Sequence, residues 1–279
     1  MKWLHTDGGM YWFVFVSAFL GVAVWESVRP RVSLKESVER RWGLHALLVL
    51  AALLAGAVLL PLSPLMLAAS MSGSHYGLLN KPLVPLALRW ILAILLLDLT
   101  RYFSHRAMHS FHFLWRFHQV HHSDRDFDGT TGVRGHPLEG LFSRATTLIT
   151  IVILAPPVGA VLLAELVSIS ESFFAHANAT LPDWLQRPLG LLFFTANTHV
   201  VHHSIEMREQ NSNFGDIFPW WDRLFGTYQP PLLAGDKPFV IGLKEYQKGP
   251  SLGLLSILKL PFVSQPAVAQ ESDKIAEPL

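Results

Sequence analysis

Long apolar segments are the feature that most constrains how this chain can fold. Residues 10–25 form a nearly unbroken apolar run, and a longer run rich in leucine and alanine covers residues 44–69. A third segment, residues 82–99, begins with a proline, which suits the first turn of a helix. A helix needs about 20 apolar residues to cross a bilayer. We therefore expect three membrane-spanning helices before residue 100.

A fourth apolar block, residues 141–175, is interrupted by Pro156 and Pro157. Proline lacks an N–H group and its ring clashes with the preceding turn, so one helix cannot run through this pair. The block predicts two helices joined by a tight turn, as a hairpin that enters the membrane and returns. The composition agrees with a membrane protein, because 51% of the residues are hydrophobic and only 15% are charged.

Basic residues predict the orientation of these segments. The loop between the first two spans holds five arginines and lysines, whereas the N-terminus has only Lys2 and the next loop only Lys81. Loops rich in basic residues stay in the cytoplasm. Three spans and a returning hairpin then place everything after residue 99 on the cytoplasmic side, except the hairpin itself.

Histidines carry the chemistry that the sequence indicates. The chain has 14 of them, eleven lie between His105 and His203, and the pattern H-x-x-H-H occurs twice. Histidines three or four positions apart share a helix face, so each set can direct several imidazoles at one point. Imidazole suits iron, copper and zinc. The absence of cysteine excludes thiolate sites, iron–sulfur clusters and disulfides.

The clustered histidines are too many for one ion of about four to six ligands, which favours two metals at close range. The expected ligands are His105, His109, His118, His121, His122, His176, His199, His202 and His203.

The order of these motifs resembles the membrane-bound fatty acid hydroxylase superfamily, which includes sterol desaturases. The matching text runs from about residue 98 to residue 228 and comprises HRAMH (105–109), HQVHHS (118–123), RGHPLEG (134–140), HANATLP (176–182), HVVHHS (199–204) and NFGDIFPWWDRLFGTY (213–228). The resemblance implies an all-α integral membrane bundle with a cytoplasmic helical cap that holds a di-iron site. It also implies an enzyme of a bacterial inner membrane or the endoplasmic reticulum.

The implied reaction uses O2 to hydroxylate or desaturate a lipid such as a fatty acyl, sterol or isoprenoid chain, and we favour hydroxylation. Electrons must come from outside, because the sequence has no dinucleotide fingerprint, haem motif or cysteine. We expect an NAD(P)H-linked reductase that acts through a ferredoxin or a cytochrome. The net charge of +1 gives no broad basic face for nucleic acid. We divide the chain into membrane helices (1–99), a catalytic di-metal region (100–230) and a C-terminal segment (231–279) whose tail is disordered from about residue 261.

Carboxylates are expected to orient the ligating rings by accepting their outer N–H groups. Asp98 lies seven residues before His105, on nearly the same helix face, and Glu139 and Asp222 lie within two of the motifs. Capping of a span by Asp98 and surface ion pairs of the other two remain open. Glu165 and Glu171 lie in an apolar helix, where a carboxylate faces protein or water rather than lipid.

His136 is open to three interpretations: a ligand, a donor that orients a ligand, or a residue that shapes its loop. Thr180 stands where some members of the superfamily have a further histidine, so the number of ligands can differ here.

Two other functions compete with the oxygenase. A histidine-rich membrane metal transporter or metal-binding protein would also show many histidines, but transporters usually place their ligands near the bilayer midplane. Here the histidines follow the third span and the hairpin. A zinc hydrolase of the H-E-x-x-H type is disfavoured, because that motif is absent and nine histidines exceed three ligands and a water.

Overall fold

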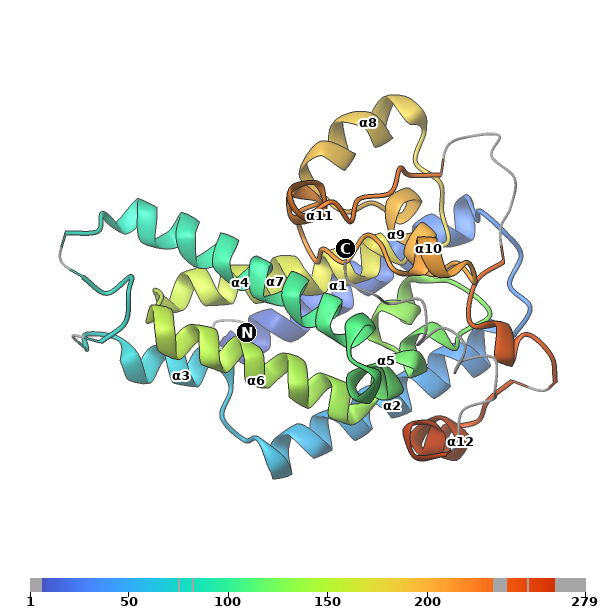
Figure 1. The fold of residues 1–279 in the computed structure, drawn as a ribbon, viewed down its shortest axis with the longest axis horizontal. Helices are drawn as coiled ribbons and strands as arrows, with labels where there is room; N and C mark the ends of the chain where they lie inside the picture. Colours follow the sequence, from blue (N-terminus) through green and yellow to red (C-terminus); the bar gives the residue numbers. More distant parts are fainter. Residues whose placement is uncertain (1–6, 75, 82, 233–239, 250, 264–279) are drawn as a thin grey trace.

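The structure is a computed structural model that describes residues 7–74, 76–81, 83–232, 240–249 and 251–263 (Figure 1). Within these residues the regular elements are helices, and β-type pairing is limited to two isolated bridges, Pro30 with Ala179 and Ser204 with Ile241. The predicted all-α class is confirmed. Beyond residue 263, the expected disordered tail lies outside the described residues.

The first three apolar runs form helices α1 to α4. Helix α1 covers Asp7–Val28, and the second run forms α2 (Val38–Leu59) and the short α3 (Pro64–Met71). The break falls at Pro61 and Pro64, and the hydroxyl of Ser63 caps α3 by accepting a hydrogen bond from the Met66 N–H at 3.1 Å. Helix α4 (Leu86–Ser110) continues past the predicted end at residue 99 and carries the first two histidines.

The fourth block forms the predicted helical hairpin, α6 (Pro137–Leu154) and α7 (Val158–Ala175). The turn contains Ala155 in the left-handed conformation (φ 45°) and the two prolines, of which Pro157 caps α7. The turn reverses the direction of the chain, and α6 and α7 each pack against α3 and α4. His176 follows directly at the end of α7.

Four segments are long and apolar enough to cross a membrane: Gly8–Val28, Val38–Met71, Pro137–Leu154 and Val158–Ala175. Helix α4, the predicted third span, is not among them, and its apolar half contains Arg89, Asp98 and Arg101. It packs against α6 and α7, with Ala93 and Leu97 fully buried. In Gly8–Val28 and Val38–Met71 only 17% and 11% of an 18-residue window are buried, as expected for helices in contact with lipid.

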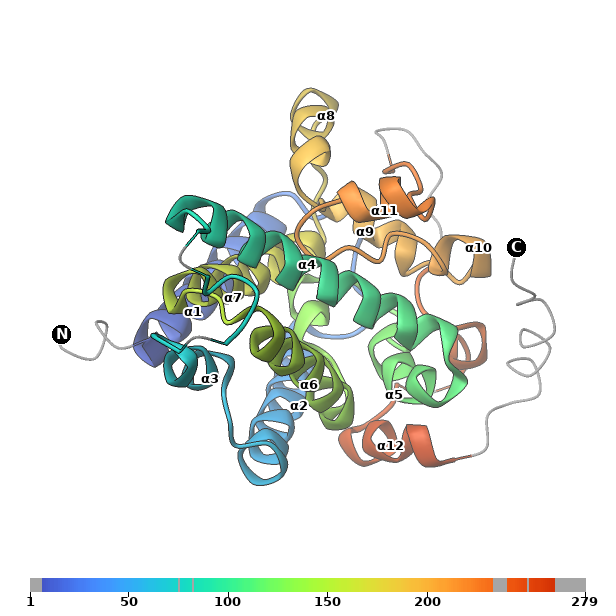
Figure 2. The same cartoon turned by 60° about the vertical axis from the view of Figure 1, so that its left-hand side comes forward.

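Helices α6 and α7 pack against α4 and connect it to the other long helices (Figures 1 and 2). Helix α6 contacts α2, α3 and α4, while α7 contacts α1, α3 and α4. The remaining elements are shorter: α5 (His112–His122), η2 (Gly129–Val133), α8 (Asp183–Leu192), α9 (Ala196–His202), α10 (Met207–Gln210), α11 (Trp220–Phe225), η3 (Lys244–Tyr246), α12 (Leu254–Lys259) and η4 (Leu260–Phe262). Helices α5, α10 and α12 lie at the end of the bundle opposite α3 (Figure 1).

The basic loop between α1 and α2 is tied to this same end. A guanidinium nitrogen of Arg31 donates to the side-chain oxygen of Asn197 at 2.6 Å. Arg41 in the first turn of α2, directly after this loop, is only 4% exposed and forms 2.7 Å ion pairs with Asp124 and Asp128. The loop and the histidine-rich region therefore share one side of the bundle, as the sequence predicted; that this side is the cytoplasm stays a prediction.

Candidate metal centre

The predicted histidines come from three helices and the end of a fourth. Helix α4 carries His105 and His109 one turn apart, and the chain turns at Phe111 into α5. Helix α5 carries His118, His121 and His122, and α9 carries His199 and His202. His176 directly follows α7 and His203 directly follows α9. Helical spacing alone thus aims each set toward the space between these helices.

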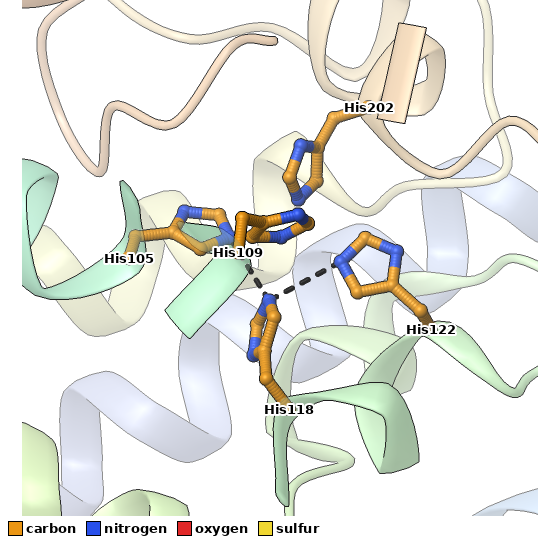
Figure 3. Close-up of side chains that lie close together, drawn as sticks. All are labelled: His105, His109, His118, His122 and His202. Carbon is orange, nitrogen blue, oxygen red and sulfur yellow. Dashed lines mark hydrogen bonds between the residues drawn. The ribbon is translucent and has the colours of Figure 1, made fainter. Parts of the chain in front are cut away.

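The structure brings all nine predicted histidines into two adjacent groups, within each of which one ring nitrogen per residue lies within 4.8 Å of the others. Group 1 (Figure 3) comprises His105, His109, His118, His122 and His202. Group 2 comprises His121, His176, His199 and His203. The groups touch, because the rings of His122 and His203 stack with centroids 4.7 Å apart.

The inner ring nitrogens are very close together. In group 1, Nε2 of His118 lies 3.1 Å from Nε2 of His105 and 3.2 Å from Nε2 of His122. In group 2, Nε2 of His176 lies 3.3 Å from Nε2 of His121 and 3.1 Å from Nε2 of His199. Five rings of group 1 therefore converge on one point, as Figure 3 shows.

The outer ring nitrogens of six histidines face oxygen acceptors, so Nδ1 is the donor in each. His105 donates to the Phe214 carbonyl at 2.9 Å, His202 to the Ser212 carbonyl at 2.7 Å, and His176 to the Ser172 carbonyl at 2.7 Å. The other three bonds run from His121 to the Arg134 carbonyl (3.2 Å), from His118 to Glu139 (2.8 Å) and from His109 to Asn211 (3.3 Å).

A neutral imidazole that donates through Nδ1 has a bare lone pair at Nε2. Two such lone pairs face each other between His105 and His118, and two more between His121 and His176. Nε2 of His109 is buried without a hydrogen-bond partner among the described residues. Convergent lone pairs repel unless a cation lies between them, so both groups fit a metal ion.

Burial keeps these rings neutral. In the rings of α5 and α9, loss of solvation together with the neighbouring imidazoles lowers the pKa well below the usual value. Burial lowers the pKa of His176 to about 4. Rings with such pKa values offer their lone pairs to a metal at neutral pH.

The three predicted carboxylates occupy different positions around the groups. Glu139 contacts a histidine directly through its 2.8 Å bond from His118. Asp222 accepts from the backbone N–H groups of Phe214 and Gly215, both at 2.8 Å, and so shapes the loop whose carbonyl holds His105. Asp98 accepts from the Ile217 N–H at 2.9 Å and the Trp221 indole at 2.7 Å, and has no ring of either group among its hydrogen-bond partners. Asp98 therefore fixes the same loop rather than a histidine.

His136 lies outside both groups. Its Nδ1 accepts from the Leu138 N–H at 3.1 Å, which caps α6, and its Nε2 faces the Leu258 carbonyl at 3.3 Å. Both ring nitrogens are used, so a residue that shapes its loop fits this geometry and a metal ligand does not. Thr180 accepts a hydrogen bond from Arg31 at 3.1 Å. It therefore helps to hold the loop between α1 and α2 against the histidine-rich region.

A cavity of about 990 Å³ leads from the histidines into the bundle. Five histidines of the two groups line one end: His105, His118, His121, His176 and His199. Residues of α1, α2, α3 and α6 line the rest, including Phe15, Leu53 and Met66. Glu165 and Glu171 both line the cavity, as their place in an apolar helix suggested.

Comparison with known proteins agrees with this geometry. The family model for the fatty acid hydroxylase domain matches residues 90–227, which contain both histidine groups. Residues 90–227 form a fatty acid hydroxylase domain.

Similar members of this family act on lipids. The chain is 34% identical over 148 residues to the ornithine lipid hydroxylase OlsE of Rhizobium tropici, which covers 53% of this chain and 44% of that protein. It is 29% identical over 154 residues to the alkylglycerol monooxygenase of Caenorhabditis elegans (55% and 29%) and 32% identical over 150 residues to that of Danio rerio (50% and 30%). The matches thus span less than half the length of these relatives. No solved structure matches the chain.

Several parts of the site were not anticipated from the sequence. The acceptors for His105, His121, His176 and His202 are backbone carbonyls, which give no signal in a residue pattern. Asn211, which holds His109, lies just before the motif that begins at Asn213 and could have been found as an amide next to it.

Proposed function

We propose that this family member is a membrane-bound lipid hydroxylase in which each histidine group holds one iron ion. The observation that carries the proposal is the convergence of bare Nε2 lone pairs at the end of a large, mostly apolar cavity. Two iron ions supply the activation of O2 that an unactivated C–H bond requires. Hydroxylation inserts one oxygen atom of O2 and reduces the other to water with two electrons and two protons.

The residues of this chain prepare that reaction. The outer hydrogen bonds of the histidines, including that from His118 to Glu139, fix the ring orientations before a metal binds. The walls formed by α1, α2, α3 and α6 suit an alkyl chain and exclude bulk water. The names of the similar proteins, a lipid hydroxylase and a lipid monooxygenase, support a lipid substrate and favour hydroxylation over desaturation.

The remaining parts of the proposal rest on the sequence. Electrons come from an NAD(P)H-linked reductase through a ferredoxin or a cytochrome. The histidine side of the bundle faces the cytoplasm, in a bacterial inner membrane or the endoplasmic reticulum. Residues 1–99 serve as membrane helices, residues 100–230 as the catalytic region, and residues 231–279 as a C-terminal segment.

The test begins with metal content. The purified full chain from iron-supplemented cells should hold about two iron ions, and a His202→Ala/His203→Ala double variant, which takes one ligand from each group, should lose most of them. His112→Ala, an exposed histidine of α5 outside both groups, is the matched control and should keep them.

Activity is then measured with isotope-labelled O2 and a lipid mixture. Transfer of labelled oxygen to a lipid supports the hydroxylase. Metal uptake into vesicles without oxidised lipid would instead support the transporter, and an iron-free wild type would contradict the proposal.

A further inference from the structure

A polar cluster lies in the cavity beside the histidine groups. Arg101 of α4 pairs with Glu165 of α7 at 2.6 Å, and its Nε lies 3.6 Å from Asp216. Ser168 donates to Asp216 at 2.6 Å. These four residues and Glu171 line the same cavity.

Two polar side-chain atoms of this region are left without partners. Nη1 of Arg101 and Oε1 of Glu171 are buried and have no hydrogen bond to any described residue. Glu171 is only 7% exposed. A buried donor or acceptor without a partner costs free energy, so such groups in native proteins usually meet a ligand or water. Ionisable side chains within apolar helices typically mark a functional site.

The cluster lies close to the proposed metals. Arg101 precedes His105 by four residues, which is about one helical turn on α4. Glu171 precedes His176 by five residues on α7. Farther from the histidines, the cavity is lined by apolar residues of α2 and α3 such as Val49, Leu53 and Met66. The cavity is therefore polar at its histidine end and mostly apolar beyond it, apart from Arg144 and the hydroxyl residues of α6.

We propose that Arg101 and Glu171 form a subsite that binds the polar end of the lipid substrate, with its chain extending between α2, α3 and α6. The polar group must accept a hydrogen bond from Nη1 of Arg101 and donate one to Oε1 of Glu171. An amide group does both, whereas an ester only accepts. This inference rests on the proposed function for the identity of the site, but it concerns binding alone.

The experiment compares two lipids of equal chain length, dodecanamide and methyl dodecanoate, in equilibrium binding to the iron-loaded full chain without O2 or reductant. We expect the wild type to bind the amide roughly ten-fold more tightly, as one hydrogen bond to a charged group predicts. Glu171→Leu should reduce that preference to less than about three-fold, because it removes the acceptor. Arg101→Lys, which retains a charge for Glu165 but lacks Nη1, should weaken binding of both lipids.

The matched control is Glu39→Leu, an exposed carboxylate on α2 outside the cavity, which should keep the wild-type preference. Iron content shows that each variant is folded, and if Glu171→Leu does not fold, Arg101→Lys carries the test. Equal binding of the two lipids by the wild type means that the unpaired atoms are hydrated, and overturns the subsite. An unchanged preference for the amide over the ester in Glu171→Leu also overturns the subsite. Failure of the proposed function would appear separately, as missing iron or missing oxidised lipid.

Discussion

Glu139 accepts a hydrogen bond from Nδ1 of His118 at 2.8 Å, and the same carboxylate faces the backbone N–H of His136 at 3.3 Å. One side chain thus orients an imidazole of group 1 and completes the cap of α6. The membrane hairpin and the metal centre are joined through this residue.

Replacing Glu139 should weaken metal binding. Glu139→Ala removes the acceptor that holds His118, and loss of such a contact typically costs about 10- to 100-fold in metal affinity. Glu139→Gln keeps a side-chain oxygen as acceptor and should lose less. Iron retained during titration with a chelator measures both variants. Equal retention in Glu139→Ala and the wild type would show that His118 needs no such partner.

The two groups can be tested one at a time. His105→Ala affects only group 1 and His199→Ala only group 2. Each variant should lower the iron content from about two ions toward one, because the other group keeps its ligands. Elemental analysis of the purified variants gives the ratio. Full retention of two ions in both variants would contradict the assignment of one ion to each group.

Gly132 should be essential for the position of His176. A Cβ atom at residue 132 would lie 2.5 Å from the Ser172 carbonyl oxygen and 2.9 Å from Nδ1 of His176, the two atoms that share a hydrogen bond. Gly132→Ala should therefore displace His176 and reduce iron in group 2. Gly140→Ala, where nothing lies within 4 Å of the added atom, is the control and should retain the metal. Iron content and thermal unfolding of both variants check this.

Asp124 should contribute to stability over a defined pH range. Burial alone would raise the pKa of this carboxyl, but the charges of Arg41 and Arg134 hold it well below its usual range. A carboxyl with a lowered pKa stabilises the folded state above the unfolded-state value of about 3.9, and the effect is lost as the pH falls through the folded-state value.

Asp124→Asn leaves Arg41 buried with fewer partners and should cost roughly 3–5 kcal/mol of unfolding free energy near neutral pH. The difference from the wild type should persist down to about pH 4 and shrink below it. Urea unfolding followed by tryptophan fluorescence at several pH values measures it. A difference that vanishes already near pH 6 would point to another group.

The cavity should limit the length of the lipid chain. Ala52 of α2 lines the cavity, and Ala52→Phe would fill part of it. Oxidation of long-chain lipids should fall about ten-fold or more while shorter chains are less affected, because overpacking mainly excludes the bulkier substrate. Leu47→Phe, on the same helix but 48% exposed and outside the cavity, is the control. Competition between lipids of different length in one reaction gives the ratio.

The histidine cluster could be predicted because the spacing of the histidines within each helix largely determines where their rings point. Spacings of three and four residues within a helix fix which rings share a face, and all nine predicted rings converge in the structure. Their division into two groups could not be predicted. His121 and His122 are neighbours in sequence but belong to different groups, because consecutive residues on a helix point about 100° apart. Which partners each one meets depends on where α7 and α9 pack.

The hydrogen-bond partners of the carboxylates could not be predicted from the spacing of residues along a helix. Asp98 shares a helix face with His105, yet it bonds to the segment around Ile217, because that segment folds back across α4 and presents its N–H groups there. The path of this loop has no periodic pattern in the sequence. Helix α4 itself was predicted as a span from its leucines, but it is not among the segments apolar enough to cross a membrane, and its Asp98 and Arg101 are accommodated inside the bundle.

The placement of α9 has a consequence for how the chain is made. Group 1 lacks His202, and group 2 lacks His199 and His203, until this helix has been synthesised and docked. A nascent chain that has emerged only through α7 offers partial sets of imidazoles with no closed cage. Group 2 then has only His121 and His176, so we expect its ion to bind after α9 has docked, which closes the long loop of chain between His122 and His202.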